Sequence, residues 1–313
     1  MEKYCFGIDV GGTTVKCGLF LNGGTFVDKW EIKTHVENEG KQILPDIAKT
    51  VLAKIREKGL DKGEIEGIGI GVPGPVEENG EIACAVNLHW GRKNIEKELE
   101  DMTGLRVKAG NDANVAALGE MWKGGGQGAK NLILVTLGTG VGGGIIINEK
   151  IVTGAHGAGG EIGHAPVNPE EKVPCNCGNK GCLEQYASAT GIARLARKAL
   201  EETDSPSALR KYPDVTAKDV FDAYKEGDEL AEEVVEVFSE YMGRALAAFT
   251  CVTDPDVIVL GGGVSKAGQP LIDCVEKYYR NYAFPTCKET PIRLATLGND
   301  AGVYGAAKLV LNK

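Results

Sequence analysis

The chain has 313 residues, which is long enough for two domains that each bury a core. Its hydrophobic fraction of 42% and charged fraction of 25% are ordinary for a soluble globular protein, and no apolar run is long enough to span a bilayer. The net charge of −9 argues against nucleic acid and anionic membrane as partners. An anionic ligand would therefore need local compensation from backbone amides, helix termini or a metal ion.

Three strands are predicted at the N-terminus, over residues 4–10, 15–21 and 25–33, and an Asn-Gly turn signal joins the last two. The first two flank the segment Asp9-Val10-Gly11-Gly12-Thr13-Thr14. Its glycines let backbone N–H groups close on a phosphate, its threonines add hydroxyl donors, and Asp9 is a candidate ligand for Mg²⁺. A tight hairpin in which the glycines are purely structural explains the same segment equally well. The segment is not a P-loop, because no helix opens at a G-K-[ST].

A helix is predicted within residues 40–59 and a strand over 65–72, ending in the stiff Gly-Val-Pro-Gly-Pro-Val loop of residues 71–76. Asn87-Leu88-His89-Trp90 places polar groups beside an indole, which suits either a sugar platform or a core tryptophan. A short strand over 105–109 then leads into a helix that opens at Asn111-Asp112 and runs to Lys123. Capping of the helix N-terminus explains Asp112 from its position alone.

An internal repeat follows, in which residues 132–137 form a strand, 138–144 a glycine-rich turn and 145–148 a second strand. Shifted by 126 positions, Gly12, Thr13, Gly18 and Asn22 fall on Gly138, Thr139, Gly144 and Asn148. Two strand–glycine–strand units predict a duplicated fold with two phosphate-binding hairpins. As a G-x-G-x-x-G match the run is a weak dinucleotide signal, because no helix or ribose-binding acid follows.

The segment from Gly160 to Glu184 gathers His164 and the C-x-C-x4-C set Cys175, Cys177 and Cys182. Three thiolates and one imidazole form the usual ligand set of a closed, tetrahedral, structural zinc site. A disulfide or three unrelated core thiols are the alternatives. Because MEKYCFGIDV opens as a strand without a signal-peptide core, we expect a reducing cytoplasm, where clustered cysteines bind metal more often than they pair. Glu161 and Glu184 flank this cluster, and a pair of oriented carboxylates suits sugar hydroxyls.

The remaining chain is predicted to be largely helical, with one helix over 183–202, a polar loop over 205–214 and helices over 217–250 that break near Gly227. A buried strand at 257–260 runs into Gly261-Gly262-Gly263, which leaves room for a base or ribose but could equally serve close helix–strand packing. A last strand at 292–295 precedes a helix over 301–311 with one face of small residues.

The pair Glu161-Ile-Gly-His164 and Cys175-Asn-Cys177-Gly-Asn-Lys-Gly-Cys182-Leu-Glu184 resembles the signature of the ROK family of sugar kinases, in particular its bacterial glucokinases. Together with the duplicated meanders, it implies an α/β protein of the actin-like ATPase (ribonuclease H-like, duplicated) fold, with two domains flanking a cleft. We expect a smaller domain of residues 1–110 completed by the C-terminal helix 298–313, and a larger domain of residues 111–297 that carries the zinc-binding loop.

The resemblance also implies the reaction, which is transfer of the γ-phosphoryl group of ATP to the 6-hydroxyl of a hexose, with glucose as the expected substrate. It reverses the capping interpretation of Asp112, which becomes the catalytic base, and it makes His164 both a zinc ligand and a sugar contact. The remaining expected sugar contacts are Asn87, Asn111, Asp112, Glu161 and Glu184. The expected contacts to ATP and Mg²⁺ are Asp9, Gly11, Gly12, Thr13, Thr14, Gly138, Thr139, Gly140, Gly262 and Gly263.

Other sugars and other classes of protein remain as alternatives to a glucokinase. N-acetylmannosamine, N-acetylglucosamine, fructose or allose could replace glucose, because they would use the same loop. Related sugar-sensing repressors carry an N-terminal helix-turn-helix, for which a phosphate hairpin beginning at residue 9 leaves no room. A silent sugar-binding protein is disfavoured because Asp112 and both hairpins are retained. Many family members carry Lys where this chain has Thr14, and Lys16 follows two residues later. We expect a homodimer or homotetramer.

Overall fold

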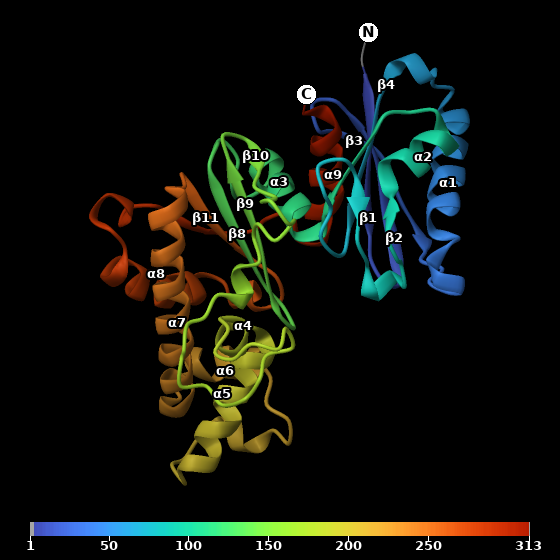
Figure 1. Cartoon of the computed structure of the whole chain (residues 1–313). Coiled ribbons are helices and arrows are strands. Elements are labelled where there is room, and N and C mark those ends of the chain that lie inside the picture. Colours follow the sequence, from blue (N-terminus) through green and yellow to red (C-terminus); the bar gives the residue numbers. More distant parts are fainter. Residues whose placement is uncertain (1–2, 313) are drawn as a thin grey trace. The chain divides into compact units, whose positions relative to one another are not determined.

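The computed structural model describes residues 3–312 (Figure 1). The chain divides into two compact units. Unit 1 comprises Met1–Gly128, Gly144–Gly160 and Leu297–Lys313, and unit 2 comprises Ala129–Gly143 and Glu161–Thr296. The expected domain boundary at residue 110 stays a prediction.

Unit 1 contains a five-stranded sheet of order β3-β2-β1-β4-β7. Its strands are β1 (Tyr4–Val10), β2 (Thr14–Leu21), β3 (Phe26–Lys33), β4 (Ile65–Val72) and β7 (Val107–Asn111). The first three form the predicted antiparallel meander, whereas β4 and β7 continue the sheet in parallel with β1. The strand predicted at 105–109 therefore begins two residues later than expected.

Helices cover both faces of this sheet (Figure 1). On one face, α1 (Ile43–Lys58) and α2 (Ile95–Thr103) bury Ile47, Val51 and Leu99 against Phe6 and Ile8. Pro45 lies in the first turn of α1, where its missing N–H breaks no helical hydrogen bond. On the other face, α9 (Ala301–Leu311) buries Val303, Ala307 and Val310 against Cys5 and Phe20.

The predicted small-residue face of α9 allows it to lie almost in contact with the backbone of its neighbours. A Cβ atom at Gly69 would lie 1.7 Å from the carbonyl oxygen of Ala306, and one at Gly305 would lie 1.7 Å from that of Val115 in α3 (Asp112–Lys123). Any larger residue at either position would force these elements apart. The glycines thus fix α9 between the sheet and α3.

A second sheet has the order β10-β9-β8-β11-β12. Its strands are β8 (Leu132–Leu137), β9 (Val141–Ile147), β10 (Lys150–Ile151), β11 (Val257–Gly261) and β12 (Ile292–Leu294). As in the first sheet, the strand before the glycine turn is central, the next two strands extend one side, and later strands join the other side in parallel. This shared order confirms the duplicated fold.

The glycine turn between β8 and β9 is shorter than predicted, because β9 begins at Val141 rather than at residue 145. Gly144 lies inside the strand because α3 crosses there, and a Cβ atom at this position would lie 2.5 Å from the Cβ of Ala117. The turn itself is therefore Gly138-Thr139-Gly140.

Unit 2 carries most of the helices, namely α4 (Glu184–Ala187), α5 (Ala189–Glu202), α6 (Ala217–Lys225), α7 (Glu229–Thr253) and α8 (Gln269–Tyr282). The prediction of one helix over 183–202 is wrong, because Ser188 is extended and its hydroxyl accepts the N–H of Gly191 as the N-cap of α5. The predicted break near Gly227 is confirmed. The prediction also missed α2 and the short pair β5 (Glu81–Ile82) and β6 (Lys93–Asn94). Within residues 3–312, no helix has the length and apolar character that crossing a membrane requires.

Candidate active site

The first glycine turn, Gly11-Gly12-Thr13, is exposed between β1 and β2 and is braced from β3. The buried Thr34 donates its hydroxyl to the carbonyl oxygen of Gly11 at 2.7 Å and its backbone N–H to that of Thr13 at 3.0 Å. Gly11 N–H also donates to the carbonyl of Thr14. The turn therefore has a defined shape, and Thr34 is a site residue that sequence reasoning missed.

Asp9 is the last polar residue of β1 before this turn. The pKa of its carboxyl is raised to about 6, chiefly by burial; Lys16 opposes this shift, and the nearby Asp112 carboxylate adds to it. The strand register places Lys16 directly opposite Asp9, and the Lys16 ammonium donates to the carbonyl of Asn299 at 3.0 Å. Lys16, two residues after Thr14, therefore faces Asp9.

Asp112 lies at the same edge of the sheet as Asp9. The parallel register aligns Asp9 with Gly71 and Gly71 with Gly110, so the chain reaches Asp112 two residues beyond this line. The side chain of Val115 packs against both glycines of this line, 3.3 Å from a Cβ atom at Gly71 and 2.8 Å from one at Gly110. Carboxyl ends of parallel strands are the usual position of ligand sites in such sheets.

The capping interpretation of Asp112 is wrong, because the cap of α3 is Asn111. The Asn111 side-chain oxygen accepts the N–H groups of Ala113 and Asn114 at 3.0 and 3.1 Å, and its amide donates to the carbonyl of Gly74 at 3.2 Å. The half-buried Asp112 accepts the N–H of Ala113 at 2.8 Å through one carboxylate oxygen. Asn111 therefore orients Asp112, while its predicted sugar contact stays a prediction.

Trp90 is a core residue rather than a sugar platform. Its side chain is only 4% exposed, and its indole N–H donates to the carbonyl of Gly40 at 3.0 Å. Asn87, by contrast, is exposed in the short turn Val86–Leu88. Its carbonyl oxygen would lie 3.8 Å from a Cβ atom at Gly12, so this turn approaches the first glycine turn.

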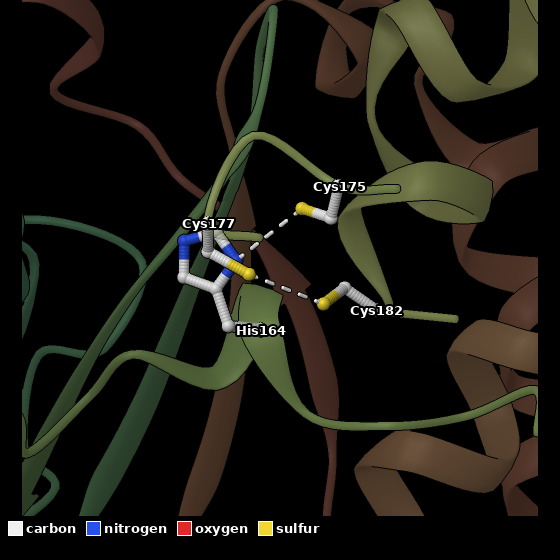
Figure 2. A group of neighbouring side chains, drawn as sticks. All are labelled: His164, Cys175, Cys177 and Cys182. Carbon is white, nitrogen blue, oxygen red and sulfur yellow. Dashed lines mark hydrogen bonds between the residues drawn. The ribbon is translucent and has the colours of Figure 1, made fainter. Parts of the chain in front are cut away.

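His164, Cys175, Cys177 and Cys182 come together in unit 2 (Figure 2). Their ligand atoms all lie within 4.8 Å of one another, with 3.6 Å between the sulfurs of Cys177 and Cys182 and 3.7 Å between Cys175 Sγ and His164 Nδ1. In a tetrahedral zinc site with bonds of about 2.3 Å, ligand atoms are separated by about 3.7 Å. A disulfide would need a separation of about 2.05 Å. The four side chains therefore fit a tetrahedral metal ion.

The imidazole of His164 faces two ways. Its Nδ1 points into the cysteine cluster, whereas its Nε2 lies 4.0 Å from a carboxylate oxygen of the exposed Glu161. Burial raises the pKa of the Cys182 thiol to about 12, so at neutral pH this thiol keeps its proton until a metal ion displaces it. A metal in the cluster would leave the Nε2 edge and Glu161 available for another ligand.

Glu184 lies beside the second glycine turn. Its Oε2 accepts the N–H of Val141 at 2.9 Å and would lie only 2.2 Å from a Cβ atom at Gly140. Gly138 N–H donates to the carbonyl of Gly140 at 2.9 Å, and Thr139 is exposed at the tip. A predicted sugar residue and the predicted phosphate turn are thus neighbours in the same unit.

A cavity of about 290 Å³ lies next to the Gly262-Gly263 turn in unit 2, with Thr216, Phe221 and Lys266 among its lining residues. Gly262 adopts a φ of +84°, and a Cβ atom there would lie 2.5 Å from the carbonyl oxygen of Leu137. Only glycine tolerates both constraints. The turn therefore holds the cavity wall tightly against β8.

The predicted site residues thus divide between the two units. Unit 1 holds Asp9, Gly11, Gly12, Thr13, Thr14, Asn87, Asn111 and Asp112. Unit 2 holds Gly138, Thr139, Gly140, Glu161, His164, Cys175, Cys177, Cys182, Glu184, Gly262 and Gly263.

The duplicated sheets, each with a glycine turn after its central strand, define a protein of the actin-like ATPase fold class. The chain matches the ROK family over residues 5–313, so it belongs to that family, as its signature predicted. It is 46% identical to the glucokinase of Halalkalibacterium halodurans, over 99% of this chain and 95% of that protein. It is 36% identical to the glucokinase of Thermotoga maritima, over 97% and 96% of the two chains. A ROK family glucokinase from Streptomyces griseus, solved in complex with glucose and AMPPNP, matches with a TM-score of 0.74 at 31% identity, covering 99% of this chain and 100% of that one.

Proposed function

We propose that the protein is an ATP-dependent glucokinase, which converts ATP and D-glucose into ADP and glucose 6-phosphate. Relatives named as glucokinases over nearly the whole chain support this reaction. The observation that carries the proposal is the shared edge of the first sheet, where Asp9 and the first glycine turn lie at the end of β1 and Asp112 follows the end of β7, with β4 between these two strands. This arrangement supplies a phosphate cradle and a carboxylate base within one unit.

Asp112 accepts the proton of the sugar 6-hydroxyl as that oxygen attacks the γ-phosphorus of ATP. The bond from the γ-phosphorus to the bridging oxygen breaks, and ADP leaves. The turns Gly11–Thr14 and Gly138–Gly140 bind the phosphates through backbone N–H groups other than those of Gly11 and Gly138, which donate within their own turns. Gly263 lines the cavity that would receive the nucleoside, and Gly262 precedes it in the same turn. Asp9 would hold Mg²⁺, which neutralises phosphate charge when bound.

The cluster of His164, Cys175, Cys177 and Cys182 would hold a structural zinc ion. With four protein ligands, zinc leaves no position for a reacting water, so its contribution is to fix the loop. Glu161, His164 and Glu184 of this loop, together with Asn87 and Asn111, would bind the sugar hydroxyls. We further propose that residues 1–110 with 298–313 close against 111–297 to exclude water, in a cytoplasmic homodimer or homotetramer that acts in glycolysis.

The Asp112→Asn variant tests the base directly. Asparagine can still accept the N–H of Ala113, so the variant should fold, and glucose affinity should stay within about tenfold. Turnover should fall by about 10²–10⁴-fold, the usual contribution of general base catalysis. The exposed Asp101→Asn serves as the matched control. Unchanged turnover of the Asp112→Asn variant would remove Asp112 from the reaction.

The sugar is tested with a coupled assay of ADP release across glucose, N-acetylglucosamine, N-acetylmannosamine, fructose and allose. Glucose should give the highest kcat/KM. A higher value for an acetylated amino sugar or for another hexose would replace glucose as the substrate and leave the kinase assignment in place. Absence of ADP release with every sugar would contradict the kinase proposal.

A further inference from the structure

Residues 163–189, which include His164 and the three cysteines, hold the second glycine turn at three points. Val141 N–H donates to Oε2 of Glu184 at 2.9 Å, and the N–H of Ala189 donates to the carbonyl of Gly138 at 2.8 Å. Gly163, next to His164, packs so closely that a Cβ atom there would lie 2.1 Å from the carbonyl oxygen of Val141. Both ends of the turn are therefore tied to residues that flank the metal ligands.

The side chain of Glu184 links the Cys/His cluster to the second glycine turn. It lies two residues after Cys182, and its Oε1 is 3.8 Å from the sulfur of Cys175, while its Oε2 reaches Val141. Leu183 N–H donates to the carbonyl of Ala165 at 2.9 Å, which anchors the start of this short helix to the residue after His164. The position of the Glu184 carboxylate is thus set by the same loop that the metal would order.

Glu161, the other carboxylate expected to bind sugar, has a different environment. It is exposed, and one of its carboxylate oxygens lies 4.0 Å from Nε2 of His164. It belongs to the same loop and has the same chemistry as Glu184, but it does not brace the turn. Comparing variants of the two glutamates therefore distinguishes an effect on sugar binding from an effect on the second glycine turn.

We propose that Glu184 is a positioning residue for ATP, through which the metal-ordered loop sets the shape of the second phosphate turn. Affinity for nucleotide then depends on Glu184 and on the metal cluster even when no sugar is present. The inference rests on the proposed kinase function, and it adds a nucleotide role to a residue assigned to the sugar. A carboxylate has four acceptor sites, so one of them can hold Val141 while others face a sugar hydroxyl.

The test is binding of AMPPNP with Mg²⁺ to the metal-loaded protein without sugar, measured by calorimetry. Glu184→Ala should weaken binding about tenfold, because a hydrogen bond to a charged acceptor is lost and the turn loosens. Glu184→Gln keeps an oxygen that can accept from Val141, so its nucleotide affinity should stay within about threefold of wild type. Glu161→Ala should leave nucleotide affinity unchanged while weakening glucose binding.

Removal of the metal with a chelator provides a second readout. It should weaken nucleotide binding in the wild-type protein. It should have little further effect in the Glu184→Ala variant, because that variant already lacks the hydrogen bond to Val141. Equal nucleotide affinity of wild type, Glu184→Ala and metal-free protein would overturn this inference and leave the kinase proposal intact. Failure of the wild-type protein to bind nucleotide would overturn both.

Gly140 supplies a variant that perturbs the same contact from the other side. A Cβ atom there would meet Oε2 of Glu184 at 2.2 Å, so Gly140→Ala should displace the carboxylate and weaken nucleotide binding. In the Glu184→Ala background that space is vacant, so the second substitution should cost less than it does alone. Strict additivity of the two effects in a double-mutant cycle would contradict the proposed contact.

Discussion

At neutral pH the ionised carboxylate of Asp9 lowers the stability of the folded protein, and the Asp9→Asn variant should reveal this. Burial first, and then the Asp112 carboxylate, raise its pKa from 3.8 to about 6. A carboxyl with a higher pKa in the folded chain binds its proton more tightly there. Folding is therefore favoured while the group is protonated, below pH 3.8, and that advantage is lost as the pH rises through about 6.

The magnitude follows from the two pKa values. One pKa unit corresponds to about 1.36 kcal/mol, so ionising Asp9 costs the folded state about 1.5 kcal/mol at pH 5 and about 3 kcal/mol at pH 7.5. Asn has nearly the shape of the protonated acid and does not ionise. The Asp9→Asn variant should therefore be more stable than wild type by these amounts, with the gap widening between pH 4 and pH 6.5 and constant above it.

Urea unfolding followed by tryptophan fluorescence is a suitable assay, because Trp30, Trp90 and Trp122 all lie in unit 1 with Asp9. The variant should also lose phosphoryl transfer, because Mg²⁺ needs the ionised carboxylate. Asp28→Asn is the control of opposite sign, since hydrogen bonds from Lys54 and Lys58 lower the pKa of Asp28 to about 2. A stability gap between Asp9→Asn and wild type that is the same at pH 5 and pH 8 would refute the reasoning.

Three further predictions concern the turns and the metal loop. Cys177→Ser should lose the metal and glucose binding together, since a missing ligand disorders the loop; full metal content by elemental analysis would contradict this. Thr34→Val removes the hydroxyl that binds the carbonyl of Gly11 and should raise the KM for ATP about fivefold with little change for glucose. Equal rises for both substrates in steady-state kinetics would show a general defect instead. Gly262→Ala must place a Cβ at a φ of +84° and 2.5 Å from Leu137, so it should lower the Tm by several degrees and weaken AMPPNP binding; an unchanged melting curve would be inconsistent with the strain.

Local sequence signals were sufficient where an element is defined by its own residues. The strands β1 and β4 have the predicted ends because apolar runs stop at glycine or at a glycine–proline loop. Helix α2 was missed even though Asn94 caps it and Ile95 and Leu99 form its buried face, because the run is only nine residues long. The break at Ser188 was missed because the apolar period continues across it, and one extended residue stops the helix.

Local spacing also predicted that His164 and the three cysteines come together, because these four residues lie within a span of 19 residues. Other parts of the site depend on contacts between distant residues. Thr34 lies 23 residues from Gly11 and reads as an ordinary strand end, and Glu184 lies 43 residues from Val141. No periodicity or motif within either segment records which backbone group the side chain will meet.

The two glycine turns show why the repeat predicts the cradle but not its support. Duplication preserved the strand–glycine–strand hairpin, since backbone N–H groups can enclose a phosphate only where glycines allow it. The braces were not duplicated: the hydroxyl of Thr34, just after β3, holds the first turn, and the carboxylate of Glu184, just after the metal loop, holds the second. The brace of the first turn comes from a segment outside the Cys/His cluster, whereas the brace of the second turn comes from the loop that carries the proposed metal ligands. Removal of the proposed metal ion should therefore disturb the second glycine turn more than the first.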